Sequence, residues 1–242
     1  MARPALVFFD VGDTLVRPDP SWIDVYLSVC HEYGLELSRE QLAGGFRVAL
    51  ESGVLDQAGP FEVGPEASFE RIRRFDEAVM AATDHPGLPR DFFEALGTRF
   101  RERASWHVFP DVAPALARLA EAGIRRAVIS NWVWEAPELL HELDLAAWFE
   151  ALVISDRVGY NKPHPGIFEA ALARTGVAPA EALHVGDSFR NDVLGARAVG
   201  IATVLLARGV PAGQRPPEVP ADDPVRIVAD LGGLLDLLGL AG

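Results

Sequence analysis

Four short polar stretches, each beyond the end of a strand-like apolar run, contain the residues with the clearest chemical potential. In chain order, these residues are Asp10 and Asp13, then Ser130 and Asn131, then Lys162, and finally Asp187 and Asp192. A single acidic or hydroxyl residue after a strand is usually a helix cap. Four such stretches in succession are not explained by capping, and their carboxylates, hydroxyl, amide and ammonium group would together suit chemistry on an anionic substrate.

Lysine occurs once in the sequence, at position 162, whereas the other 21 of the 22 basic residues are arginine. Arginine presents a wide planar fork of donors, while lysine presents a compact, mobile point charge that fits between two oxygens in a tight pocket. A position that keeps lysine in such a chain is one where arginine would not work. We therefore interpret Lys162 as a functional residue.

Strand and helix patterns alternate from residue 106 onward. Strand-like runs lie at 125–130, 151–154, 182–185 and 202–206, and helical apolar spacing lies at 112–122, 135–143, 165–175 and 191–199. An opening strand at 6–9 and a last short strand near 226–228 complete the pattern. This alternation predicts parallel βαβ units, and hence an α/β, Rossmann-like, doubly wound parallel sheet.

About 90 residues without a strand pattern follow the first strand. Helical patterns cover 21–33, 38–50, 66–82 and 90–103, and Ser38 with Gln41 makes a capping box. We predict a core domain of residues 1–16 and 106–242, with an inserted helical cap domain of residues 17–105. Such an insert would lie over the carboxyl edge of the sheet, where open α/β folds bind ligands. The arginine clusters at 71–74 and 99–103 are interpreted as solvated helix faces.

Composition and charge narrow the classes of partner. The net charge of −13 argues against a nucleic-acid partner, because phosphate backbones require basic surface. The apolar run at 5–9 is too short for a signal peptide or a membrane span. A single cysteine, Cys30, excludes an internal disulfide and fits a reducing compartment. We expect a cytoplasmic protein with no nucleic-acid or membrane partner, and either a monomer or a homodimer.

The four polar stretches, taken in this order, resemble the motifs of the haloacid dehalogenase-like hydrolase superfamily, in its branch with a helical cap after the first motif. The resemblance covers essentially the whole chain. It implies a strand order of 3-2-1-4-5, with Asp10 and Asp187 on neighbouring central strands and Ser130 on the other side of Asp10. The form Asp-x-Gly-Asp-Thr-Leu at 10–15 is similar to a subgroup of that superfamily.

The resemblance also implies roles for these residues. Asp10 would be the nucleophile and a Mg²⁺ ligand, Asp187 would bind Mg²⁺ directly, and Asp192 would support the metal shell or Lys162. Ser130 and the backbone of Asn131 would bind the transferring phosphoryl group, with Lys162 neutralising charge beside it. The physical logic agrees, because an anionic carboxylate needs a cation and fixed donors to approach a phosphate. Mg²⁺ prefers carboxylate and carbonyl oxygens, which suits Asp10, Asp187 and the carbonyl of Gly12.

One departure from the family pattern affects catalysis. Phosphatases of this superfamily usually carry an acid/base aspartate two residues after the nucleophile, where this chain has Gly12. Asp13 falls one place later, and a shift of one residue on an extended segment turns a side chain to the opposite face. Asp13 is therefore a candidate for proton transfer only if the loop is remodelled; otherwise it caps the loop or forms an ion pair.

The leading hypothesis is a Mg²⁺-dependent hydrolase of small phosphorylated metabolites, slowed by the missing acid at Gly12. A metal-independent 2-haloacid dehalogenase is one alternative, although Asp187 would then have no task. A phosphate-ligand or partner-binding protein that has lost efficient catalysis is another. Trp132 and Trp134 are expected near the mouth of the site. Six other residues are open candidates for the substrate cleft: Trp22, Arg47, Arg71, His85, Trp106 and His107.

Overall fold

A computed structural model describes residues 3–211 and 214–240 of the chain, and a twisted parallel sheet forms its centre. Within those residues the sheet has six strands in the order β5-β4-β1-β6-β7-β8. The bounds of the strands are β1 Leu6–Phe9, β4 Arg125–Ser130, β5 Leu152–Ile154, β6 Ala182–Gly186, β7 Ala202–Leu206 and β8 Arg226–Val228. All neighbouring strands pair in parallel. The predicted α/β fold and the strand order 3-2-1-4-5 are confirmed, with β8 added at one edge.

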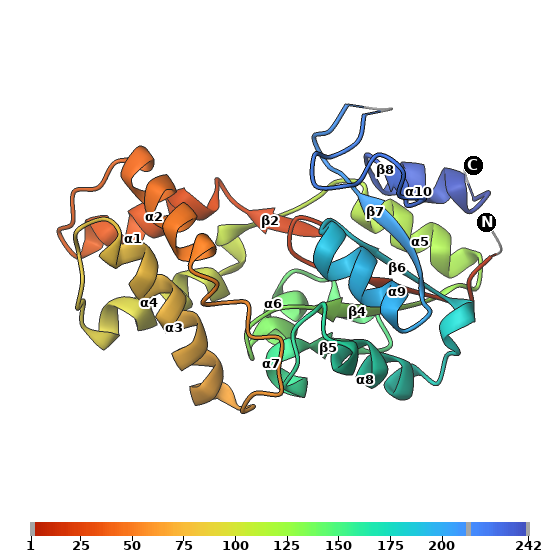
Figure 1. Ribbon diagram of the computed structural model, residues 1–242, viewed down its shortest axis with the longest axis horizontal. Helices are drawn as coiled ribbons and strands as arrows, with labels where there is room; N and C mark the ends of the chain where they lie inside the picture. Colours follow the sequence, from red (N-terminus) through yellow and green to blue (C-terminus); the bar gives the residue numbers. More distant parts are fainter. Residues whose placement is uncertain (1–2, 212–213, 241–242) are drawn as a thin grey trace.

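Helices cover both faces of this sheet (Figure 1). One face packs against α5 (Val112–Glu121), α6 (Ala136–Glu142) and α10 (Leu231–Leu237). The other packs against α8 (Pro165–Thr175) and α9 (Gly195–Ala198). Residues of β1 are buried on both sides, because Val7 and Phe9 join the first apolar layer and Leu6 and Phe8 join the second. A central parallel strand covered on two faces is therefore a continuous apolar run rather than an alternating one.

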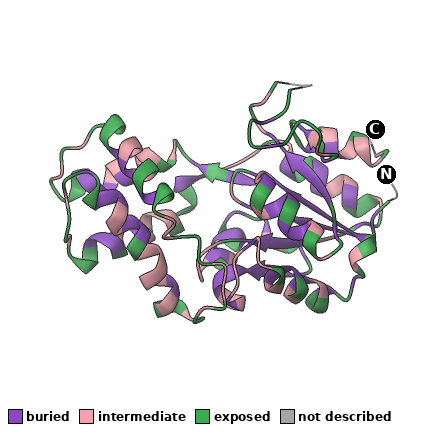
Figure 2. Cartoon of the chain, viewed as in Figure 1, coloured by how far each residue is buried: buried purple, intermediate pink, exposed green. Residues whose placement is uncertain are grey.

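Four helices form a separate layer beyond the carboxyl ends of the strands, at the left of Figure 1. They are α1 (Trp22–Glu32), α2 (Arg39–Glu51), α3 (Pro65–Ala81) and α4 (Arg90–Arg101). The predicted capping box of Ser38 and Gln41 is present at the start of α2. These helices bury their own apolar cluster, which includes Val29, Val79 and Phe92. Figure 2 shows this buried stripe facing inward between the helices, with exposed positions around it.

Two features differ from the predicted elements. Strands β2 (Val16–Pro18) and β3 (Trp106–Val108) pair antiparallel where the chain enters and leaves the four helices. Each has only three residues, which is too short to give a readable alternation. The predicted helix at 191–199 is divided into a π-helical turn, Phe189–Leu194, and the short α9. The wider turn contains Asp192, one of the predicted site residues. None of the helices in the described part of the chain combines the length and the apolar character needed to cross a membrane.

Candidate active site

The carboxyl ends of three adjacent strands bring the predicted site residues together. Asp10 follows β1, Ser130 ends β4 and Asp187 follows β6. Strand β1 lies between the other two, as the predicted order requires. In a parallel sheet these ends meet at one edge, so residues more than 170 positions apart in sequence become neighbours. Asp10 and Ser130 are both buried, at 7% and 1% exposure.

The Asp10 carboxylate is held by two donors on the same oxygen. The hydroxyl of Ser130 donates to Oδ1 of Asp10 at 2.8 Å, and Nζ of Lys162 donates to that oxygen at 2.6 Å. Oδ2 of Asp10 accepts no side-chain hydrogen bond from the described residues. One oxygen of the carboxylate is therefore fixed while the other is left for chemistry, which is the arrangement expected of a positioned nucleophile.

Lys162 sits between three oxygens. Besides Asp10, its Nζ donates to Oδ1 of Asp192 at 2.6 Å and to the carbonyl of Ile129 at 3.1 Å. Burial alone would lower the pKa of this lysine, but the charges of Asp10 and Asp192 outweigh burial and raise the pKa above its ordinary value. The ammonium group therefore remains charged across the physiological range.

Asn131 fixes the loop that carries this lysine. Its side-chain amide accepts from the backbone N–H of Lys162 at 2.6 Å and donates to the carbonyl of Lys162 at 2.9 Å. This pair of hydrogen bonds joins the end of β4 to the loop before α8. The side chain of Asn131 thus positions Lys162, a role additional to the phosphoryl contact predicted for its backbone.

The carboxylate of Asp192 is surrounded by residues at the end of β6 and in the turn that follows it. Its Oδ1 accepts hydrogen bonds from Lys162 and from Nε2 of His184, at 2.6 and 2.8 Å, and its Oδ2 accepts from the backbone N–H of Ser188 at 2.9 Å. Burial would raise the pKa of Asp192, yet Lys162 and the bond to His184 lower it below its ordinary value. A Cβ at Gly186 would lie 2.2 Å from Cγ of Asp192, so only glycine leaves room for this carboxylate.

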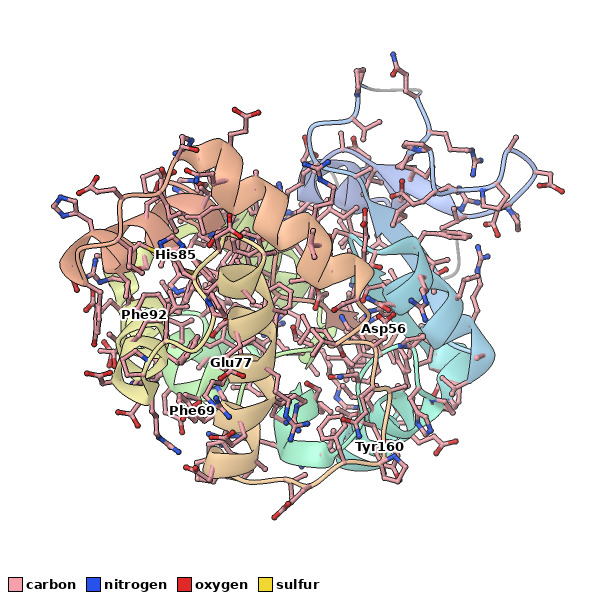
Figure 3. All side chains as sticks on the ribbon, turned by 60° about the vertical axis from the view of Figure 1, so that its left-hand side comes forward. Asp56, Phe69, Glu77, His85, Phe92 and Tyr160 are labelled. Atoms are coloured by element: carbon pink, nitrogen blue, oxygen red, sulfur yellow. The ribbon has the colours of Figure 1, made fainter. Side chains whose placement is uncertain are left out.

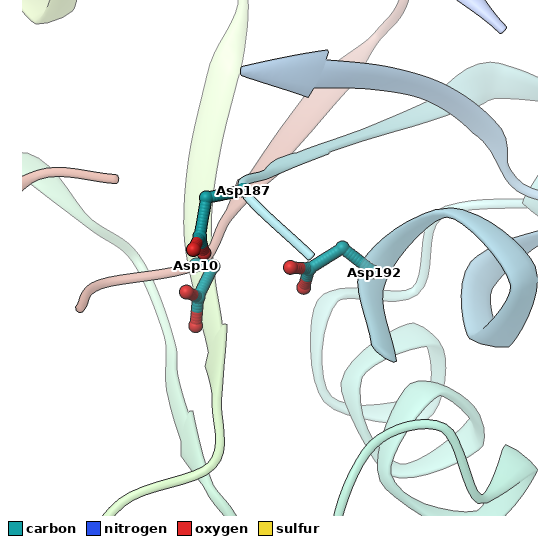
Figure 4. A group of neighbouring side chains, drawn as sticks. All are labelled: Asp10, Asp187 and Asp192. Atoms are coloured by element: carbon teal, nitrogen blue, oxygen red, sulfur yellow. The ribbon is translucent and has the colours of Figure 1, made fainter. Parts of the chain in front are cut away.

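Asp187 completes a cluster of three carboxylates with Asp10 and Asp192, drawn in Figure 4. One oxygen from each of the three lies within 4.8 Å of the others. Burial, followed by the charges of Asp10 and Asp192, raises the pKa of Asp187 to about 8. The positive charge of Lys162 alone therefore does not balance the negative charge of three ionised carboxylates, and the cluster favours binding of an additional cation.

The donor set fits Mg²⁺. Asp10 and Asp187 supply carboxylate oxygens, and the Gly12 carbonyl belongs to the same loop as Asp10. Mg²⁺ prefers oxygen ligands of this kind and keeps several waters. Both oxygens of Asp192 are already committed to Lys162, His184 and Ser188, so this residue is better suited to holding the lysine than to binding the ion directly.

Gly12 and Asp13 differ in their surroundings. Gly12 has a φ outside the left-handed region, and a Cβ added there would meet no atom within 4 Å. Asp13 adopts a left-handed φ of 52° and is exposed at the surface of the loop. Partial loss of hydration, followed by the charge of Asp10, raises the pKa of Asp13, and Arg17 acts against this rise. The structure thus leaves space where the usual acid/base aspartate would stand, with Asp13 beside that space.

Helix α3 and the core meet through a buried ion pair. Nη2 of Arg71 lies 2.7 Å from Oδ1 of Asp156, and the two side chains are 13% and 7% exposed. The hydroxyl of Ser68 binds the same carboxylate and accepts from the backbone N–H of Trp134 at 2.9 Å. The Arg71 guanidinium also stacks over the ring of Phe61, 4.0 Å from its centroid. The interpretation of Arg71 as part of a solvated helix face is therefore wrong, because its guanidinium is largely buried and forms an ion pair with Asp156.

The loop after α2 forms a second contact with the core, beside Lys162. The backbone N–H of Phe61 donates to the carbonyl of Gly159 at 3.0 Å, and Asn161 donates to the carbonyls of Ala58 and Gln57 at 2.8 and 2.9 Å. Gly59 approaches so closely that a Cβ would lie 2.6 Å from the Gly159 oxygen. Figure 3 shows this loop running from Asp56 down past Tyr160. We call residues 57–61 the strap.

The other residues predicted as candidates for the substrate cleft differ in their surroundings. Trp106 is buried and packs against Trp22 and Trp132, with ring centroids 5.7 and 5.0 Å away. Arg47 is exposed on α2, and Nδ1 of His85 lies 2.7 Å from the carbonyl of Thr83, in the turn after α3. Those contacts give Trp106 and His85 structural roles that do not require contact with a substrate. Two residues near the site were not predicted, His184 and Asp156, and the signal available for His184 was a lone histidine inside an apolar strand.

Comparison with known proteins identifies the family. A sequence model described as haloacid dehalogenase-like hydrolase matches residues 4–200. A glyceraldehyde 3-phosphate phosphatase of Methanopyrus kandleri is 41% identical over 214 residues, covering 84% of each chain. A phosphoserine phosphatase of Thermus thermophilus is 37% identical over 178 residues; the match covers 72% of this chain and 64% of that relative, less than two thirds of its length.

A solved dehalogenase structure with an intermediate complex has a TM-score of 0.70 and 25% identity, and covers 98% of each chain. The two chains therefore share the same overall fold over nearly their whole length. The family match spans four fifths of the sequence and includes all four polar stretches. On this evidence, the chain is a hydrolase and belongs to the haloacid dehalogenase-like hydrolases.

Proposed function

We propose that the protein is a Mg²⁺-dependent phosphatase of small phosphorylated metabolites, with Asp10 as the nucleophile. The observation that carries the proposal is the hydrogen bonding of Asp10. Ser130 and Lys162 both donate to Oδ1, at 2.8 and 2.6 Å, which orients the carboxylate and leaves Oδ2 for attack. Phosphatases among the relatives support the same reaction class.

The proposed reaction has two steps. Oδ2 of Asp10 forms a bond to phosphorus as the bond to the leaving oxygen breaks, giving an aspartyl-phosphate and an alkoxide that takes a proton from solvent water. Water then attacks phosphorus, releasing inorganic phosphate and restoring Asp10. The positive charge of Lys162 would stabilise negative charge that develops on the phosphoryl oxygens, and Ser130 would do so when its hydroxyl turns from Asp10 to one of these oxygens. When bound by Asp10, Asp187 and the Gly12 carbonyl, Mg²⁺ would offset the repulsion between the nucleophile and the phosphate.

Gly12 sets the substrate preference within this proposal. A side chain that could protonate an alkoxide is missing from that position, and Asp13 lies in a left-handed turn beside it. A general acid contributes about 10²–10⁴-fold in rate. We therefore expect faster turnover of acyl and aryl phosphates, whose leaving groups need no proton, than of alkyl phosphates. The form Asp-x-Gly-Asp-Thr-Leu would define a subgroup with this preference.

The two-part division of the chain belongs to the same proposal. Residues 17–105 would act as the cap that covers the site, and residues 1–16 and 106–242 as the core that carries it. The Arg71–Asp156 pair and the strap support this division, because both join the inserted helices to the rim of the sheet.

A substrate panel tests the proposal. Purified protein would be assayed with Mg²⁺ against alkyl, aryl and acyl phosphates, beginning with phosphoserine and glyceraldehyde 3-phosphate because relatives are named for them. Borohydride added during turnover would reduce an aspartyl-phosphate at Asp10 to homoserine, which peptide mass spectrometry detects. Turnover without that trapped product, or undiminished turnover by Asp10→Asn, would refute the covalent mechanism.

Dehalogenation is the second candidate, because the chain lacks an acid/base aspartate at position 12 and shares its architecture with a dehalogenase. Attack on carbon has no use for a metal-binding aspartate, and Asp187 weighs against it. Halide release from 2-haloacids in the presence of a chelator would select this alternative. Tight phosphate binding with no turnover of any ester would select a binding protein instead.

A further inference from the structure

His184 is a polar residue buried in an apolar layer. It lies in the middle of β6, paired across the sheet with Phe8 on one side and Thr203 on the other. Its side chain is fully buried and meets the ring of Phe168 edge-on, with centroids 5.5 Å apart. Burying a polar ring in such a layer costs free energy unless the ring is hydrogen-bonded, so its presence calls for a specific partner.

That partner is Asp192, and the bond fixes the tautomer of the ring. Nε2 of His184 lies 2.8 Å from Oδ1 of Asp192, whereas Nδ1 is buried with no hydrogen-bond partner in the described part of the chain. A proton on Nδ1 would be a buried donor without an acceptor, which is more costly than an unused lone pair. The geometry therefore favours a proton on Nε2, which donates to Asp192.

The oxygen that accepts from His184 is also the oxygen that holds Lys162. Nζ of Lys162 lies 2.6 Å from Oδ1 of Asp192 and 2.6 Å from Oδ1 of Asp10. The second oxygen of Asp192 accepts from the backbone of Ser188, and Gly186 leaves the space that the carboxylate fills. Three features of β6 and the turn after it thus determine where the Asp192 carboxylate lies: the His184 side chain, the space at Gly186 and the backbone N–H of Ser188.

We infer that His184 is a positioning residue: its Nε2–H sets the orientation of Asp192, which in turn places the ammonium group of Lys162 against Asp10. The effect on turnover rests on the proposed function. The effect on Lys162 does not, because it follows from the hydrogen bonds alone. Loss of the donor frees Asp192 to rotate, and Lys162 then loses the fixed anion on its far side.

The single lysine permits a direct test that needs no substrate. Protein labelled with ¹⁵N-lysine gives one side-chain ammonium resonance, that of Lys162. We expect a slowly exchanging signal in the wild type and in His184→Gln, whose amide can reach Asp192. In His184→Leu we expect it to shift and exchange faster. Long-range ¹H–¹⁵N spectra of ¹⁵N-histidine protein should show the Nε2–H tautomer at His184, and an Nδ1–H tautomer there would overturn the inference.

Kinetics test the consequence for catalysis. Removing a residue that orients a catalytic group typically costs about 10–100-fold in activity. We expect His184→Leu to lose about that factor in kcat with KM nearly unchanged, and His184→Gln to stay within about fivefold of wild type. Leu183→Val is the matched control, because Leu183 is equally buried and neighbours His184 but faces the other apolar layer. It should lose stability without losing kcat.

The outcomes separate this inference from the proposed function. If the wild type hydrolyses no phosphate ester, the proposed function fails, and the lysine resonance still decides the role of His184. An unchanged resonance in His184→Leu, or an unchanged kcat, would refute that role. If His184→Leu does not fold, His184→Gln decides the question. The role of His184 would be refuted if folded His184→Gln lost the slowly exchanging lysine signal and lost as much kcat as Lys162→Met.

Discussion

The Nζ atom of Lys162 lies 2.6 Å from Oδ1 of Asp10, and the residue as a whole is only 4% exposed. Its three N–H donors are matched by three oxygens, from Asp10, Asp192 and the carbonyl of Ile129. Three is the number of N–H donors that an ammonium group carries, whereas a guanidinium group carries five in a fixed fork. The pocket therefore explains why a chain rich in arginine retains a lysine here.

Replacing that lysine by arginine should be as damaging as deleting its charge. We expect Lys162→Arg and Lys162→Met each to lose on the order of 10²–10³-fold in kcat, the usual cost of removing an electrostatic stabiliser. Steady-state kinetics on an aryl phosphate would measure the loss. Arg118→Lys, a side chain that is 43% exposed, is the control for arginine–lysine exchange and should be neutral. A Lys162→Arg enzyme with near wild-type kcat would contradict the shape argument.

Gly12→Asp should restore a proton donor to the site. The position has room for a Cβ and a φ that any residue can adopt, so the variant should fold without strain. We expect kcat for alkyl phosphates to rise by about tenfold or more, with a smaller change for acyl phosphates. Gly12→Asn adds the same bulk without an acid and should not show the gain. Equal rates for wild type and Gly12→Asp, with fast wild-type turnover of alkyl esters, would mean that another group donates the proton.

The pKa of Asp187, raised to about 8, predicts how metal and pH interact. Without metal, the folded state holds this proton more tightly than the unfolded chain, whose aspartate has a pKa near 3.8. Stability should therefore fall as pH rises from about 4 to about 8. Mg²⁺ needs the ionised carboxylate, so its stabilising effect should grow over the same interval, to about 2.7 kcal/mol at 100 times Kd.

Thermal unfolding with Mg²⁺ and with EDTA, measured between pH 5 and pH 8.5, checks this coupling. Asp187→Asn removes the titrating group and should abolish the Mg²⁺ effect while raising the stability of the metal-free protein at pH 8. Equal Mg²⁺ stabilisation at pH 5 and pH 8.5 would show that Asp187 is not a ligand.

Asp76 should make a second, metal-independent contribution of the same sign. It is buried among α1–α4, where burial raises its pKa to about 7 despite the hydrogen bond that Tyr26 donates to it. The folded state therefore loses stability as pH rises from about 4 to about 7, by at most about 4 kcal/mol. Asp76→Asn keeps an acceptor for Tyr26 and should flatten this slope without changing the Mg²⁺ effect. An unchanged pH–stability curve would contradict the prediction.

The Arg71–Asp156 pair should behave as a buried ion pair between α3 and the core. Arg71→Met leaves Asp156 without its cation and should destabilise the protein by about 3–5 kcal/mol. Replacing both partners by apolar residues, Arg71→Met with Asp156→Leu, should recover much of that loss. Denaturant unfolding of the two single variants and the double variant gives the coupling energy. Additive losses would show that the two side chains do not interact.

Sequence patterns were sufficient for the parts of the molecule that long, regular elements determine. The apolar runs and helical spacing predict a parallel α/β sheet, the four helices between residues 21 and 103 and the capping box at Ser38, whereas the order of the strands follows from the resemblance to the haloacid dehalogenase-like hydrolases. The residues at strand ends are also predictable, because parallel strands place their carboxyl ends together. That rule places Asp10, Ser130 and Asp187 at one edge of the sheet, and the strand order implied by the resemblance makes them neighbours there.

Other features depend on contacts between distant segments, which leave no periodic signal. The three-residue strands β2 and β3 are stable only because they pair with each other. Arg71 resembles any arginine on a polar helix face until Asp156 is placed against it. His184 is a single polar residue in an apolar strand. Its role depends on the π-helical turn, which places Asp192 against Gly186 and within hydrogen-bond distance of His184.

The strap is hydrogen-bonded to the residues immediately before Lys162, so the covering helices and the reacting groups share one short piece of backbone. Asp10, Ser130 and Lys162 are buried, so the cap proposed above for residues 17–105 would have to lift to admit a substrate. Lifting it either breaks the bonds at Gly159 and Asn161 or draws the lysine away from its carboxylate. With the strap detached, the enzyme would therefore not hydrolyse its substrate. A bound ester would react only after the strap has returned to Gly159 and Asn161.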